Sequence, residues 1–143
     1  MVIAKSIRAA FGPLCVLLAL SASAAEEFRV RLTPVPIDPA TRATVTGSGS
    51  ARATVDGNRL TIAGTFSGLQ GPAIAARLHM GPVTAVRGPA IAELTVTHAA
   101  SGEVNGTVEL DPAALDALRA GRLYVQIASE PAPDGNLWGW LLP

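Results

Sequence analysis

Cysteine, histidine, lysine and aromatic residues are all scarce in this sequence of 143 residues. It has one Cys, two His, one Lys and six aromatic side chains, and its eleven basic residues are balanced by eleven acidic ones. Because the net charge is zero and no basic cluster occurs, nucleic acid is excluded as an expected partner. Hydrophobic residues make up 49%, too many for a disordered chain, and the length suits one domain with its own core.

The N-terminal segment is typical of a secretory signal peptide. Lys5 and Arg8 form a short basic start, residues 9–20 are apolar, and small residues follow. We predict a signal peptide over residues 1–25 and an exported domain, periplasmic or secreted, over residues 26–143. The protein would then meet a membrane only through this transient segment.

A membrane anchor is the alternative for the same segment. Its uncharged stretch lies at the lower length limit for a spanning helix, but Gly12 and Pro13 interrupt its start. Cleavage would remove Cys15, the single cysteine, and with it any disulfide or thiolate chemistry. Core packing alone is therefore expected to hold the exported domain together.

The exported part alternates between apolar and polar residues with a period of two, which predicts β-strands. Strands are predicted over residues 28–33, 51–55, 60–66, 73–80, 89–97, 103–110, 122–128 and 136–142. The Asp56-Gly57 pair supplies the positive φ of a tight turn between the second and third strands. Seven or eight short strands predict an all-β sandwich.

One short helix is predicted between the strands. Asp111 suits the N-cap, Pro112 the first helical position, and Gly121 the left-handed position after the C-terminus. Leu115 and Leu118 lie on one face of this helix. We expect it to close one end of the core by burying these two leucines.

Several motifs follow one another along the exported part. They are VRLTP after Phe28, the hairpin GSGSARATVDGNRLTIAGTFSGL, HMGP at 79–82, GTVEL before the helix, LRAGRLYV at 118–125, and LWGWL after the Asp134-Gly135 turn. In order and spacing the chain resembles the CHRD domain, the chordin-type module that is also found alone in exported bacterial proteins. The resemblance implies an antiparallel Greek-key β-sandwich. It implies no agreed activity, because in animals the module sits in secreted growth-factor antagonists and in bacteria its role is largely unassigned.

The chain departs from the family at two of three positions where imidazoles are typical. The resemblance would place a His-x-His pair and a later His at positions that hold Arg77, His79 and Ala128 here, and such a set could bind a metal. A zinc or copper site needs three or four ligands, and His98 is the only other imidazole. We therefore expect no metal and no cofactor, with His79 as a hydrogen-bonded residue at a strand end and His98 in a solvated loop.

The strongest candidate for a binding surface in this sequence is a group of aromatic residues. Trp138 and Trp140 share one face of the last predicted strand, where family members carry polar residues, and Tyr124 can join them from a neighbouring strand. Together with Arg77 and His79 they form a candidate binding face, since such amphipathic surfaces bind proteins or stack on sugars. The alternative is that the tryptophans belong to the core or seal the helix against the sandwich.

Catalytic patterns are weak by comparison. No G-x-S-x-G setting or comparable nucleophile occurs. The carboxylates of Glu103, Glu109, Asp111 and Asp116 would support glycoside chemistry only if the fold brought a pair to one cleft, and their placement favours structural roles. No catalytic residue is predicted.

The sequence therefore predicts an exported, cofactor-free module that acts by binding a protein or glycan of the cell envelope and is not an enzyme. A metal-handling or enzyme-like sandwich is one alternative. A structural protein of the cell envelope is the other.

Overall fold

The structure is a computed structural model that describes Gly12 and residues 25–143. The strands are β1 (Glu26–Pro34), β2 (Ser48–Asp56), β3 (Arg59–Ser67), β4 (Ala73–Met80), β5 (Ala90–Val96), β6 (Gly102–Glu109), β7 (Leu123–Ser129) and β8 (Leu137–Leu142). Every predicted strand has a counterpart among these eight, with ends shifted by at most a few residues. The predicted signal peptide lies outside the described residues, except for Gly12 and Ala25.

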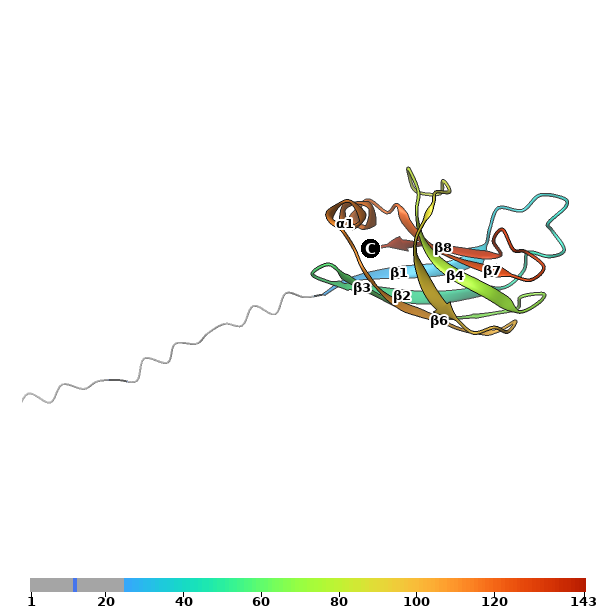
Figure 1. The fold of residues 1–143 in the computed structure, drawn as a ribbon, viewed down its shortest axis with the longest axis horizontal. Coiled ribbons are helices and arrows are strands. Elements are labelled where there is room, and N and C mark those ends of the chain that lie inside the picture. Colours follow the sequence, from blue (N-terminus) through green and yellow to red (C-terminus); the bar gives the residue numbers. More distant parts are fainter. Residues whose placement is uncertain (1–11, 13–24) are drawn as a thin grey trace, which may run out of the picture.

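The strands close into a barrel (Figure 1), so the predicted sandwich is wrong. Around the barrel the order is β1-β2-β3-β6-β5-β4-β7-β8, and β1 pairs antiparallel with both β2 and β8. Alternation along a strand marks one buried face in a sandwich and in a barrel alike, which is why the sequence did not separate them. The Greek-key connection implied by the family resemblance is present, because β7 returns to lie beside β4.

The barrel interior is filled by the inward residues of each strand. In β1 these are Phe28, Val30 and Leu32, all at most 3% exposed. An eight-stranded barrel is narrow enough for side chains to fill its interior. The predicted hairpin of β2 and β3 is confirmed, with the positive φ of 61° at Gly57.

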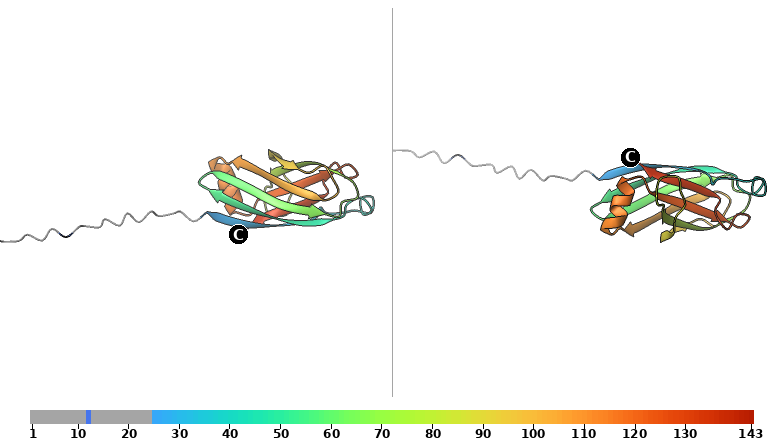
Figure 2. Two further views of the ribbon diagram at one scale, coloured as in Figure 1. Left: turned by 90° about the horizontal axis from the view of Figure 1, so that it is seen from below. Right: turned by 90° about the horizontal axis from the view of Figure 1, so that it is seen from above.

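The predicted helix is present as α1 (Pro112–Arg119) and lies across one end of the barrel (Figure 2). The Asp111 carboxylate accepts a hydrogen bond from the Ala114 backbone N–H at 2.7 Å, and Gly121 has a φ of 72°. Leu118 is fully buried, whereas Leu115 is only partly buried against the core. The segment 35–47 lies at the opposite end.

Outer faces differ around the barrel. On most strands the outward residues are exposed, but on β7 the outward Tyr124 and Ala128 are buried as well. Something on the outside of the barrel must therefore cover β7. Among the described residues, no helix is long and apolar enough to cross a membrane.

Candidate functional site

The strand register brings four rings together on the outside of β4, β7 and β8. Tyr124 on β7 pairs with His79 on β4 and with Trp140 on β8, and Trp138 lies one row further along β8. We call these four side chains the aromatic cluster. They are the aromatic and imidazole members of the predicted binding face, and antiparallel pairing of three adjacent strands is what places them side by side.

The rings of the aromatic cluster are in direct contact. His79 stacks on Tyr124 with ring centroids 4.8 Å apart and planes 17° apart, and Trp140 lies 4.5 Å from Tyr124 on its other side. Trp138 meets Tyr124 and Trp140 edge-on, at 5.7 and 5.5 Å. Offset and edge-to-face contacts of this kind favour association beyond the area they bury, so the four rings support one another.

The segment between β4 and β5 covers this cluster. The Gly88 N–H donates to the Tyr124 hydroxyl at 3.0 Å, and that hydroxyl donates to the Gly88 carbonyl at 3.1 Å. The same carbonyl accepts from Nδ1 of His79 at 2.9 Å, so Nδ1 carries the proton. The expectation of a hydrogen-bonded His79 at a strand end is thus confirmed. Nε2 is left as the ring's remaining hydrogen-bonding atom.

Trp138 and Trp140 lie outside the barrel interior, each half-buried. Trp140 is close to Gly81, since a Cβ there would lie 3.0 Å from the indole. Trp138 instead packs on a small satellite cluster of Val35, Val45 and Ala132. Trp138 therefore does not seal the helix, because its neighbours lie at the opposite end of the barrel. Trp140 lies beside the segment between β4 and β5, where the Gly81 N–H donates to the Arg122 carbonyl just after the helix.

The fifth residue of the predicted face, Arg77, stands apart from the rings. It lies opposite Gln126 in the register, and its Nε donates to a carboxylate oxygen of Glu93 at 2.6 Å. This ion pair balances its charge. Sequence reasoning missed a different arginine, Arg87, whose guanidinium carbon lies 5.9 Å from the ring centroid of Trp138. Arg87 sits in an irregular loop, where no periodic pattern could assign it to the face.

A cleft of about 270 Å³ adjoins Trp138. Its walls come from the segments 35–45 and 131–135, and they include Val35, Val45 and Ala132, on which the indole packs. Arg87 also lines the cleft and donates to the Asp134 carbonyl at 3.3 Å. The aromatic cluster and this cleft are therefore continuous, with Arg87 at their junction.

A buried polar network holds the cleft in place. The Ser129 hydroxyl donates to Oδ1 of Asn136 at 2.7 Å, and Nδ2 of Asn136 donates to the Thr46 carbonyl at 2.7 Å. Ser129 and Asn136 are both fully buried. These hydrogen bonds fix the 35–47 segment against the turn between β7 and β8. They also pair the buried polar groups, which would cost free energy if they were left without a partner.

Two buried polar atoms of this region, in contrast, have no hydrogen-bond partner in the described part of the chain. They are Nε1 of Trp140 and Oε1 of Gln126, which lie on neighbouring strands. Unpaired buried donors and acceptors cost free energy and are rare in native structures.

The positions at which the family resemblance implies imidazoles lie on this same outer surface. Arg77 and His79 are on β4, and Ala128 is on the adjacent β7, opposite Ala75. The structure shows no group of three or more His, Cys, Asp or Glu residues suited to a metal within the described part. His98 is exposed in the turn after β5, as predicted.

The predicted carboxylates take structural positions. Glu103 and Glu109 lie at opposite ends of β6, about 20 Å apart at the rise of an extended strand, and Asp111 caps the helix. Glycoside hydrolysis needs two carboxyl groups within about 10 Å. The two strand carboxylates therefore cannot form such a pair.

A closed barrel of eight antiparallel strands, with its site on the outer wall, defines a small all-β module. The family model of the CHRD domain matches residues 22–141 of the chain. The chain therefore belongs to the CHRD domain family. No match was found among curated proteins or among solved structures.

Proposed function

We propose that this CHRD domain is exported and acts by binding a protein or glycan of the cell envelope, not by catalysis. The observation that carries the proposal is the pair of half-buried indoles, Trp138 and Trp140, on the outer wall of the barrel beside a cleft. Tryptophan supplies a large contact area with one polar handle, which is why it dominates binding surfaces.

The support beneath the indoles favours recognition. Tyr124 is 1% exposed and is held by two hydrogen bonds to Gly88, so the rings stand on a rigid base. A surface that is already ordered loses less entropy on binding. The cleft beside Trp138 adds a concave element, and Arg87 adds a positive charge at its edge.

The test measures retention of envelope components on the immobilised mature domain. Soluble glycan fragments and envelope proteins are applied separately, so that the class of partner is read directly. We expect Trp138→Ala to lose the retained component, because it removes the indole that packs on Val35, Val45 and Ala132 in the wall of the cleft. Ile74→Ala is the control, since it truncates a 43% exposed side chain of β4 that lies outside the aromatic cluster and outside the lining of the cleft.

A second variant, Arg87→Gln, keeps the test valid if Trp138→Ala fails to fold. Among the described residues, the Arg87 side chain makes one hydrogen bond, to a backbone carbonyl, and one contact with an indole face, so its replacement should leave the fold intact. Retention that survives both substitutions would overturn the proposal.

Export is tested by intact mass: the exported protein should begin at Ala25 or Glu26 and lack Cys15. A mass that includes residues 1–24 would overturn the export part.

A further inference from the structure

The outer wall formed by β1, β2 and β3 carries an unusual pair of like charges. Arg29 on β1 lies directly opposite Arg52 on β2, and Arg31 is two residues further along the same face of β1. Like charges directly opposite each other destabilise a sheet. A sequence that keeps such a pair on neighbouring strands breaks a local rule, and such departures concentrate at functional sites.

Few carboxylates compensate these arginines. Glu27 lies 3.5 Å from the guanidinium of Arg52, and this pair is exposed. Within the described residues, Arg29 and Arg31 form no ion pair. The face therefore holds an excess of positive charge, although the chain as a whole is neutral.

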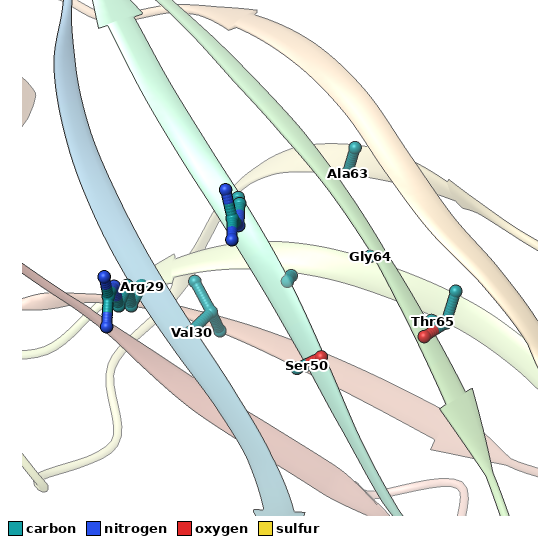
Figure 3. A pocket seen from close by; sticks show the side chains of 8 residues that line it. Arg29, Val30, Ser50, Ala63, Gly64 and Thr65 are labelled. Carbon is teal, nitrogen blue, oxygen red and sulfur yellow. The ribbon is translucent and has the colours of Figure 1, made fainter.

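A shallow hollow of about 470 Å³ lies between these arginines and β3. Figure 3 shows Arg29 on β1, Ser50 on β2, and Ala63 and Thr65 on β3 around it. Ser50 and Thr65 are paired in the register, so their hydroxyls lie side by side, while Ala63 is too small to fill the space beside Arg52. We call this hollow, with its arginines, the arginine trough.

We propose that the arginine trough binds an acidic polysaccharide. Guanidinium groups recognise carboxylate, sulfate and phosphate oxygens through paired N–H donors, and the two hydroxyls can exchange hydrogen bonds with sugar hydroxyls. The trough lies on β1 to β3, whereas the aromatic cluster lies on β4, β7 and β8. The inference therefore does not depend on the function proposed for the aromatic cluster.

The lining favours a polysaccharide over a protein or a membrane. Protein interfaces centre on large apolar or aromatic anchors, and the lining has none whose side chain is exposed. Basic membrane-binding surfaces insert several apolar side chains beside their charges. Among the described residues, Leu142, opposite Arg29 on β8, is the one exposed large apolar residue that borders the trough through the strand register.

The experiment measures binding of the mature domain to sodium polygalacturonate, which carries carboxylates, and to dextran sulfate, with neutral dextran as the reference. The variant Arg29→Gln/Arg52→Gln removes the facing pair. The control Arg42→Gln/Arg59→Gln removes the same charge from other exposed positions. Thermal unfolding of both variants verifies that they fold.

We expect binding to at least one acidic polymer, and its affinity should fall about tenfold or more in the trough variant, since each guanidinium lost removes charge-assisted hydrogen bonds. The control should stay within about twofold, and added salt should weaken binding. Which polymer binds identifies the anion. Equal losses in both variants, no preference over neutral dextran, or binding only to phosphatidylglycerol vesicles would overturn the proposal.

Discussion

Two parts of the barrel wall are built from strands with the same alternation of inward and outward residues, but their outer surfaces are very different. The aromatic cluster on β4, β7 and β8 is packed, hydrogen-bonded and largely buried, with Tyr124 at its centre. The arginine trough on β1, β2 and β3 is exposed, and its charges repel one another. The aromatic cluster therefore stabilises the fold, whereas the repulsion between the charges of the arginine trough opposes it.

This difference shows that exposure alone does not identify a binding surface in a small barrel. The interior is filled on both sides by the same kind of apolar residue, so what distinguishes the two walls is how the outward side chains are supported. Substitutions on the aromatic side should cost stability, and those in the trough should not. The following predictions test this contrast.

The largest effect is expected for Tyr124→Ala. The side chain is 1% exposed, contacts three other rings and makes two hydrogen bonds to Gly88, so its loss should lower the free energy of unfolding by about 3–5 kcal/mol. Urea denaturation measures this. Tyr124→Phe, which keeps the ring, should cost about 1–2 kcal/mol. A loss below about 1 kcal/mol for Tyr124→Ala would show that the cluster does not support the fold.

A smaller loss is expected when the polar network behind the cleft is broken. Asn136→Ala leaves the Ser129 hydroxyl and the Thr46 carbonyl without their partners, and should cost about 2–3 kcal/mol. Hydrogen exchange should also show faster exchange in the 35–47 segment, because Asn136 holds it to the barrel. Ser129→Ala, which removes only one bond, serves as the comparison, and unchanged exchange in Asn136→Ala would contradict this role.

The strand pattern was largely predictable because alternation is a local property. The Asp56-Gly57 turn and the Asp111 cap were found from single residues whose backbone preferences are strong. Closure was not predictable, since it depends on β8 finding the free edge of β1, a pairing between the two ends of the domain. No local signal specifies which strands meet over that separation.

The site, like the fold, could be predicted in part from the sequence. The two tryptophans stood out because they share a strand face, and Tyr124 and His79 could be added through strand pairing. Arg87 and Asn136 were missed as functional residues because they act from a loop and a turn, where side-chain direction depends on the whole fold. The facing of Arg29 and Arg52 likewise required the register.

The half-buried state of the indoles gives a third, intermediate prediction. Trp138→Ala should cost about 1–3 kcal/mol, less than a core tryptophan, because part of the ring already faces solvent. Intrinsic fluorescence of the single-tryptophan variants Trp138→Phe and Trp140→Phe reports each indole alone. Both should show iodide quenching between that of a free and a buried indole. Complete protection of both rings would assign them to the core and would remove the binding face.

The smallest effect is expected in the arginine trough, and it should have the opposite sign. Arg29→Glu replaces the like-charge pair with Arg52 by an opposite-charge pair, so the free energy of unfolding should rise by a few tenths of a kcal/mol, up to about 1 kcal/mol. The gain should shrink as salt screens it. Arg59→Glu is the matched control, since it places a second carboxylate opposite Glu109 and should lower stability at low salt. If Arg29→Glu instead lowers stability as much as the control does, the facing arginines are not in conflict, and the contrast between the two walls would no longer hold.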